Sequence, residues 1–152
     1  MRETTGNLWE LHEKGTIVCI TTNGVVSRQG RAQMLRGCAR QAAERFPDLA
    51  QRLGALIAAD GNHVYDLGDG LVSFPVEETP YANPDPDIIR RSAMELVQLA
   101  DRRHWQEIIL PRPGCGSGGL DWKDVRPLIE QILDDRFVLI TDLREIGNCR
   151  GD

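Results

Sequence analysis

The sequence predicts a single α/β domain spanning residues 1–152, a three-layer α/β/α sandwich whose sheet is mixed and mostly parallel. Three observations favour this fold. Short apolar runs occur at residues 17–20, 108–110 and 137–141, the pattern of strands that are buried on both faces. Segments with apolar residues at helical spacing alternate with these runs, as in βα units. The length of 152 residues is ordinary for one domain, and no internal repeat divides the chain.

In the first half of the chain, the strand at residues 17–20 runs into the turn-forming sequence Thr-Thr-Asn-Gly. A helix is expected next, because apolar residues recur at i, i+3, i+4, i+7 and i+11 until Pro47 stops the pattern. This stripe consists of Leu35, Cys38, Ala39, Ala42 and Phe46. Residues 62–67 and 70–76 flank a Gly-Asp-Gly turn and are expected to form a hairpin or two adjacent strands.

In the second half, a loop rich in proline, asparagine and aspartate at residues 80–86 precedes another helical stripe. The stripe consists of Ile89, Ala93, Leu96, Val97 and Ala100. The strand at 108–110 leads into a glycine-rich loop. A third helix is expected to begin near Asp124, because proline is tolerated in a first helical turn and Pro127 would lie there. Its stripe is Val125, Leu128, Ile129, Ile132 and Leu133, and the strand at 137–141 follows.

Composition excludes several classes of function. The formal net charge of −5 disfavours generic binding to nucleic acid or to an anionic membrane, because both depend on summed positive charge. No apolar run approaches the roughly 20 residues of a membrane helix, and the N-terminus carries no apolar signal segment. The four cysteines and three histidines show no metal-ligand spacing, so no metal or other cofactor is expected. A cytoplasmic protein with reduced thiols is the expectation.

The glycine-rich loop at residues 111–120 is the clearest candidate for chemistry. Four glycines in the six positions 114–119 leave main-chain N–H groups able to bind a phosphate near a helix N-terminus. The spacing of Gly114, Gly116 and Gly119, with Asp142 further on, also satisfies the dinucleotide fingerprint. That fingerprint normally opens a two-halved sheet, whereas only one unit remains here, so anion binding is favoured. A flexible connection is the alternative.

Five motifs together carry a resemblance to a known family. They are Gly6-Asn7-Leu8, Thr22-Asn23-Gly24-Val25, the Gly-Arg-Ala-x-Met-x-x-Gly pattern at 30–37, Ser73-Phe74-Pro75, and the run from Leu110 through the glycine loop to Leu-Asp-Trp at 120–122. In this order they resemble the macro domain family. The resemblance covers nearly the whole chain. It is nearest to the branch of the terminal ADP-ribose protein glycohydrolase and the macro domains of DNA-modifying toxin–antitoxin pairs.

Macro domains bind ADP-ribose, and many remove it from proteins, so the resemblance implies a set of ligand-binding residues. The Asn7 side chain and the Leu8 main chain would bind the adenine edge, and Leu143 would pack against the ring. The pyrophosphate would lie on Gly114, Cys115, Gly116, Ser117, Gly118 and Gly119. The distal ribose and the phosphates would lie among Asn23, Gly24, Val25, Met34, Arg36 and Gly37, and the predicted set also includes Cys38, Phe74 and Pro75. For Asn7 and Asn23, turn formation is the competing interpretation.

Two departures from the family pattern bear on catalysis. Phe74 stands where the glycohydrolase group has a lysine, and Gly118 stands where it has an aspartate, so a covalent lysine mechanism is disfavoured. Cys115 is interpreted as a small residue whose main chain matters, since no histidine lies near it in sequence to act as a base. Glu77 and Glu78 are interpreted as solvated loop charges. Asp121 is expected to stabilise the start of a helix.

The predicted function is therefore hydrolysis of mono-ADP-ribose from modified protein side chains, most plausibly acidic ones. Water would be positioned by the bound ADP-ribose and the loop backbone, and Asn23 would orient the ribose. The predicted partners are ADP-ribose and mono-ADP-ribosylated proteins, and a monomer is expected. Two alternatives stay open: an ADP-ribose reader without catalysis, and a hydrolase of small derivatives such as the O-acetyl ester or the 1″-phosphate.

Overall fold

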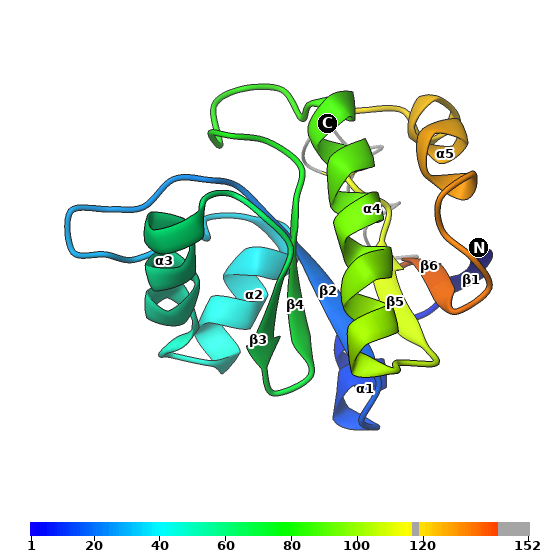
Figure 1. Cartoon of the computed structure of the whole chain (residues 1–152), viewed down its shortest axis with the longest axis horizontal. Coiled ribbons are helices and arrows are strands. Elements are labelled where there is room, and N and C mark those ends of the chain that lie inside the picture. The colour runs from blue at the N-terminus through cyan, green and yellow to red at the C-terminus, as the bar shows by residue number, and fades with distance from the viewer. Residues whose placement is uncertain (117–118, 143–152) are drawn as a thin grey trace.

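The computed structural model describes residues 1–116 and 119–142, which form a six-stranded sheet covered by helices on both faces (Figure 1). The strands are β1 (Arg2–Thr5), β2 (Ile17–Thr22), β3 (Tyr65–Gly68), β4 (Leu71–Pro75), β5 (Ile108–Pro111) and β6 (Phe137–Thr141). The helices are α1 (Leu8–Glu13), α2 (Gly37–Arg45), α3 (Leu49–Asp60), α4 (Pro86–Arg103) and α5 (Trp122–Glu130).

The sheet has the strand order β1-β6-β5-β2-β4-β3. Every neighbouring pair is parallel except β3 and β4, which pair antiparallel and so form the hairpin, the first of the two predicted arrangements. The prediction of a mixed, mostly parallel α/β/α sandwich is therefore confirmed. Because successive residues of a strand point to opposite faces, the apolar strands contribute side chains to two separate cores, one on each face of the sheet.

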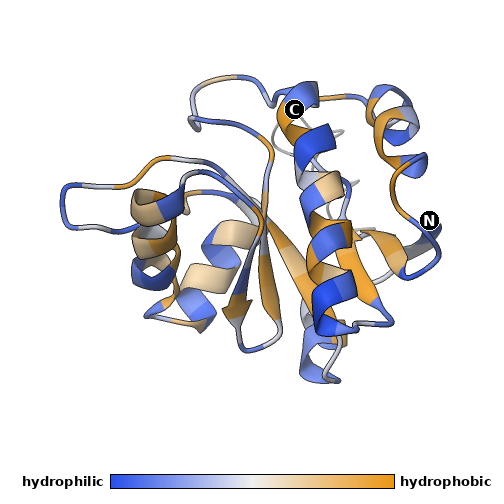
Figure 2. Cartoon of the chain, viewed as in Figure 1, coloured by the Kyte–Doolittle hydropathy of each residue, from blue (hydrophilic) through white to orange (hydrophobic). Residues whose placement is uncertain are grey.

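One core lies under α1, α2 and α3, and the other under α4 and α5. The division is visible within β2, where Val18 and Ile20 join the first core and Cys19 joins the second. In Figure 2 the central strands are coloured as apolar, while the helices carry both polar and apolar residues. The strand runs and helical stripes thus mark buried surface, as the sequence pattern predicts.

Three elements have no counterpart in the sequence prediction: β1, α1 and α3. Strand β1 is exposed at all four residues, so no apolar pattern marks it. It is held instead by its ladder to β6 and by Glu3, whose carboxylate accepts hydrogen bonds from the Trp122 indole (2.9 Å) and from Arg126 (2.9 Å). Helix α3 buries Leu49, Leu53 and Ile57 on one side; the glycine within it weakens the stripe.

Two predicted helix starts are corrected. Helix α5 begins at Trp122 after Asp121, so Pro127 lies inside the helix and not in its first turn. The proline is tolerated because its side chain and Lys123, whose carbonyl loses a donor, are both exposed. Helix α2 begins at Gly37, which leaves Leu35 outside the helix with 51% of its surface exposed. None of the helices among the described residues is long and apolar enough to span a membrane.

Candidate functional site

Several of the predicted ligand-binding segments lie at one edge of the sheet. Strands β1, β6, β5, β2 and β4 run parallel, so their carboxyl ends lie side by side, and in such sheets ligands bind beyond those ends. Four of the five motifs lie at the ends of these strands or in the segments that follow them, and the fifth, Ser73-Phe74-Pro75, forms the last three residues of β4. At a strand spacing of about 4.8 Å, the ends of β1 and β2 lie about 14 Å apart, which suits an elongated ligand laid across the strands.

Asn7 occupies the β1 end of this edge and caps helix α1. Its amide oxygen accepts hydrogen bonds from the N–H groups of Trp9 (3.0 Å) and Glu10 (3.1 Å), and its amide nitrogen donates to the Asp142 carboxylate at 3.2 Å. The turn-forming role is thus present. The same contacts fix an amide–carboxylate pair beyond β6. Leu8 is buried in the adjoining core, and Leu143 lies outside the described residues.

The glycine loop after β5 depends on Gly114 for close packing. Gly114 has a φ of +76°, and a Cβ there would lie 3.0 Å from Leu120, 3.1 Å from Pro84 and 3.2 Å from Ile89. Its carbonyl accepts the N–H of Leu120 at 2.9 Å, which closes the loop. Gly116 and Gly119 are exposed, with open space where a Cβ would stand. Ser117 and Gly118 lie outside the described residues.

The Cys115 thiol in this loop is partly buried. Burial raises the pKa of its thiol to about 11, with the nearby Arg112 only partly opposing the shift. The S–H group donates to the Pro113 carbonyl at 3.4 Å. A thiol with this pKa is neutral near pH 7, whereas the thiolate is the reactive form. The structure therefore agrees with a main-chain role for Cys115.

Asn23 follows β2 and joins the two arms of the loop at residues 23–36. Only 8% of its surface is exposed. Its amide oxygen accepts the Val25 N–H at 2.9 Å, and its amide nitrogen donates to the Gln33 carbonyl at 3.2 Å. Beyond this point the arms pair through a bridge between Val26 and Ala32. Asn23 thereby fixes the position of the whole loop beside the ends of β2 and β4.

The N-terminus of helix α2 lies over the carboxyl end of β2. The Thr21 N–H donates to the Cys38 sulfur at 3.4 Å, which places the first helical turn there. No side chain caps this end: Arg36 occupies the cap position without a capping hydrogen bond, and the first turn contains no acidic residue. The first N–H groups of an uncapped helix carry partial positive charge and favour an anion. The carboxyl edge of the sheet therefore has an electropositive region, and its charge comes from the main-chain N–H groups of α2.

The loop at residues 76–85 crosses the loop at residues 23–36, which follows β2 and is called the β2 loop below. The crossing is at Gly24. The Gly24 N–H donates to the Glu78 carbonyl at 2.9 Å, and a Cβ at Gly24 would lie 3.0 Å from the Glu78 carboxylate. The Arg36 guanidinium ties the same two loops together by donating to the Pro80 carbonyl at 2.7 Å. Phe74, by contrast, is 0% exposed and belongs to the core under α4, and Pro75 is buried beside it at the end of β4.

Glu77 differs from the solvated charge that the sequence suggests. Its side chain is partly buried, and this burial raises the pKa of its carboxyl although the Arg36 guanidinium acts in the opposite direction. Glu78 is exposed, in agreement with the prediction. The reason for the difference is tertiary: Asn62, from the segment before β3, donates to the Glu77 carbonyl at 3.0 Å and brings that segment over the loop.

We expect the Glu77→Gln variant to be more stable than the parent near pH 7. The folded pKa of Glu77 is raised, so its ionised form is disfavoured by folding at neutral pH, and that cost disappears as the pH falls through the folded pKa. The difference in melting temperature should therefore shrink toward zero near pH 4, where the parent carboxyl is protonated. Thermal unfolding of both proteins across this range measures it. A variant less stable at pH 7 would show that the contact with Arg36 outweighs burial.

Comparison with known proteins was made at the level of sequence and of structure. No family model matches the sequence, and no curated protein sequence matches it significantly. Solved structures do match. The macrodomain of Thermus aquaticus DarG superposes with a TM-score of 0.74 at 25% identity, over 91% of this chain and 95% of that chain. The macrodomain of Mycobacterium tuberculosis DarG gives a TM-score of 0.73 at 23% identity, over 91% and 95%.

The chain has the macrodomain fold. A third similar structure is Thermosipho africanus DarTG in complex with ADP-ribose, with a TM-score of 0.74 at 17% identity. That match covers 95% of this chain and 42% of the longer DarTG chain. The predicted resemblance to macro domains of toxin–antitoxin pairs is thus confirmed at the level of fold.

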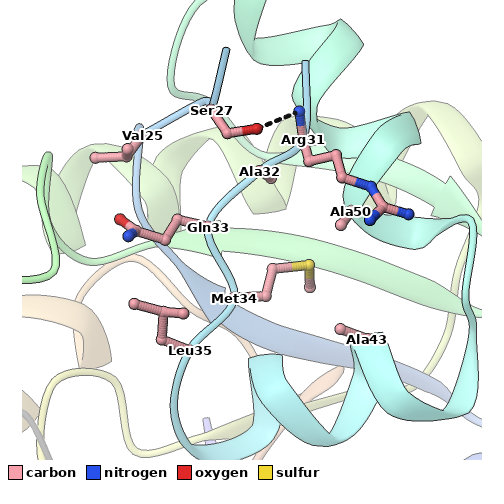
Figure 3. A pocket seen from close by; sticks show the side chains of 9 residues that line it. All are labelled: Val25, Ser27, Arg31, Ala32, Gln33, Met34, Leu35, Ala43 and Ala50. Carbon is pink, nitrogen blue, oxygen red and sulfur yellow. Dashed lines mark hydrogen bonds between the residues drawn. The ribbon is translucent and has the colours of Figure 1, made fainter. Parts of the chain in front are cut away.

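The structure also has a pocket of about 340 Å³ behind the edge, between the β2 loop and helices α2 and α3 (Figure 3). It is lined by Val25, Ser27, Arg31, Ala32, Gln33, Met34, Leu35, Ala43 and Ala50. Val25 and Met34 belong to the predicted ligand set, but no glycine-loop residue reaches the pocket. Met34 is buried in the core beneath it. The two residues therefore support the loop from behind.

Sequence reasoning missed the polar cluster that anchors the segment before β3. His63 shares a hydrogen bond of 2.8 Å with Glu95 on α4, and the Val64 N–H donates to the same carboxylate at 3.0 Å. Arg91 donates to the Asn62 carbonyl at 2.5 Å. These contacts join residues about 30 positions apart, so no local spacing could reveal them. They hold Asn62 against Gly24 and against the loop that carries Glu77.

Proposed function

We propose that this macrodomain binds ADP-ribose along the carboxyl edge of its sheet and hydrolyses mono-ADP-ribose from modified protein side chains, acidic ones in particular. The observation that carries the proposal is that the glycine loop and the uncapped N-terminus of α2 lie beyond the carboxyl ends of two neighbouring strands, β5 and β2. Both bind anions through main-chain N–H groups, which is how a chain of net charge −5 can hold a pyrophosphate. Thermosipho africanus DarTG, which shares the fold, binds ADP-ribose.

The strand order suggests how the ligand lies. The adenine belongs near Asn7 and Asp142 at the β1 end, since an amide and a carboxylate can pair with the ring edge. The pyrophosphate lies at the glycine loop and the α2 N-terminus, and the distal ribose lies beside Asn23 and Gly24. Asn23 acts through the loop that it holds, because both ends of its amide already bind main-chain groups.

Hydrolysis of an ester at the anomeric carbon makes modest demands on the protein. Water attacks the anomeric carbon, the bond to the acceptor oxygen breaks, and the acceptor leaves as a carboxylate that needs no proton. The ligand phosphate takes the proton from the water. The protein contributes by fixing the ribose, the phosphate and the water in one geometry.

A non-catalytic ADP-ribose reader is the second candidate, and one observation favours it. Phe74 stands where the resemblance places a lysine, and its side chain is fully buried and cannot contact a ligand at the edge. The two candidates share the binding site and differ only in turnover. Binding in the micromolar range, about −8 kcal/mol, is expected for both.

The deciding experiment incubates the protein with an acceptor mono-ADP-ribosylated on glutamate and measures free ADP-ribose. We expect release by the parent and loss of most release in Asn23→Ala, because the loop that positions the ribose loses its central amide.

Lys14 precedes β2 at the opposite edge and Lys123 is exposed on α5, so the Lys14→Arg/Lys123→Arg variant should keep the parent rate. Binding of ADP-ribose without its release from the acceptor would establish the non-catalytic reader. A sugar adduct trapped on Lys123 by borohydride, together with an inactive arginine variant, would restore a covalent mechanism.

A further inference from the structure

Two polar side chains from different segments meet against Gly24. A Cβ at Gly24 would lie 3.0 Å from a carboxylate oxygen of Glu78 and 3.1 Å from both Cβ and Cγ of Asn62. Glu78 belongs to the loop after β4, and Asn62 belongs to the segment before β3. Gly24 follows Asn23, and the proposed function places the distal ribose beside these two residues. The carboxylate of Glu78 and the amide of Asn62 therefore border the ribose end of the ligand site.

The backbone of both residues is held in place. The Gly24 N–H donates to the Glu78 carbonyl at 2.9 Å, which fixes Glu78 beside the β2 loop. The Asn62 amide nitrogen donates to the Glu77 carbonyl at 3.0 Å, and the Asn62 carbonyl accepts a hydrogen bond from Arg91 at 2.5 Å. Both side chains thus project from an anchored main chain, which lowers the entropy cost of using them to bind a ligand.

The acceptor atoms of these two side chains have no partner within residues 1–116 and 119–142. Neither the Glu78 carboxylate nor the Asn62 amide oxygen accepts a hydrogen bond there. A carboxylate and an amide oxygen are acceptors, so their partners are O–H or N–H groups. Ribose hydroxyls are donors of this kind, whereas a phosphate is itself an anionic acceptor. The two oxygens therefore suit the distal ribose and do not suit a phosphate.

Two arginines also lie near this end of the site, but neither forms an ion pair with Glu78. The Arg36 guanidinium donates to the Pro80 carbonyl at 2.7 Å. Arg91 pairs with the Glu95 carboxylate at 4.0 Å. The Glu78 carboxylate thus presents its negative charge beside the ribose end without a salt bridge from any arginine that the structure describes.

The other two arginines of the β2 loop lie further from Gly24. Arg28 and Arg31 belong to the tip of the loop, beyond the bridge that pairs its two arms. In Figure 1 this loop extends past α3. A ligand group at Gly24 therefore meets the charge of Glu78 at close range. Like charges a few ångströms apart repel one another, whereas a neutral group meets no such repulsion.

We propose that Glu78 is a specificity-determining residue at the distal ribose. Its carboxylate accepts hydrogen bonds from the ribose hydroxyls, with the Asn62 amide beside it, and repels a phosphate at the anomeric carbon. The ligands that fit are free ADP-ribose and ADP-ribose attached through a neutral ester, as on a modified acidic side chain. ADP-ribose 1″-phosphate is disfavoured. This inference rests on the proposed binding of ADP-ribose but not on its hydrolysis.

Calorimetry with ADP-ribose and with ADP-ribose 1″-phosphate tests this assignment. We expect the parent to bind the 1″-phosphate about tenfold more weakly than ADP-ribose. Glu78→Gln keeps an acceptor oxygen and removes the charge. Its affinity for the 1″-phosphate should therefore rise about fivefold, while its affinity for ADP-ribose changes by less than about threefold. Glu78→Ala also removes the acceptor and should bind ADP-ribose about tenfold more weakly.

Glu107→Gln is the matched control, because Glu107 is also exposed but directly precedes β5, at the opposite edge of the sheet. It should change neither affinity. The Glu78 side chain is exposed as well, so each variant should fold like the parent, and thermal unfolding checks this.

Each remaining outcome has a distinct meaning. Equal binding of the two ligands by the parent would overturn the role of Glu78 and leave the ADP-ribose site standing. The same conclusion follows if Glu78→Gln has no effect, or if it changes both affinities by the same factor, as a purely structural role would. Failure of the parent to bind ADP-ribose would overturn the proposed function and this inference with it.

Discussion

Gly116→Glu is expected to reduce the affinity for ADP-ribose by at least about 100-fold, or about 2.7 kcal/mol, without loss of stability. Gly116 is exposed in the glycine loop, and a Cβ there meets nothing within 4 Å, so a longer side chain fits without moving the backbone. The added carboxylate would lie beside the pyrophosphate, where the main-chain N–H groups are proposed to bind it. Like charges a few ångströms apart repel one another even where water screens them.

The control for this variant is Gly116→Gln, which has nearly the same shape and no charge. It should bind with a loss of less than about tenfold. Calorimetry gives both affinities, and thermal unfolding confirms that both variants are folded. Equal losses for Glu and Gln would mean that bulk and not charge disrupts binding. Parent-like binding by the Glu variant would remove the glycine loop from the phosphate site.

Gly54→Ala is expected to destabilise the fold by about 2–3 kcal/mol, although the same change in an open helix stabilises by about 0.5–1 kcal/mol. Gly54 lies within α3, where a Cβ would stand 2.1 Å from the Gly30 carbonyl oxygen and 2.9 Å from the Ala32 nitrogen. Both are backbone atoms of the β2 loop and cannot rotate away. The clash is relieved only by separating α3 from this loop, which also breaks the hydrogen bond of 2.8 Å from the Ala32 N–H to the Ala50 carbonyl.

Urea or thermal unfolding measures this effect as a fall in melting temperature of about 4–12 °C. The control is Gln51→Ala, at an exposed position of the same helix, which should change stability by less than about 0.5 kcal/mol. ADP-ribose binding by Gly54→Ala should weaken as well, because the displaced loop carries Asn23 at its base. A stabilised Gly54→Ala protein would show that the loop does not rest on α3 at this point.

The sequence alone determined the fold class of this chain and the location of its glycine loop. Burial can be read from the sequence because it gives each kind of element its own spacing of apolar residues. A strand buried on both faces is a continuous apolar run, such as residues 17–20, and a helix has an apolar stripe, such as Ile89, Ala93 and Leu96. The alternation of the two kinds then requires a parallel sheet, which places the loops at one edge. The glycine loop is equally local, since its composition marks it without reference to any neighbour.

Tertiary structure decided what no local pattern contains. Strand β1 exposes every residue and is held in place by its pairing with β6 and its contacts with α5. Pro127 lies inside a helix, where its side chain is exposed to solvent. The predicted solvation of Glu77 failed because Asn62, from another segment, covers its loop. The amide oxygens of Asn7 and Asn23 bind local N–H groups, as turn formation predicts, but their amide nitrogens bind Asp142 and the Gln33 carbonyl, which spacing does not reveal. Contacts between residues distant in the chain depend on which elements pack together, and that is settled only when the whole core has formed.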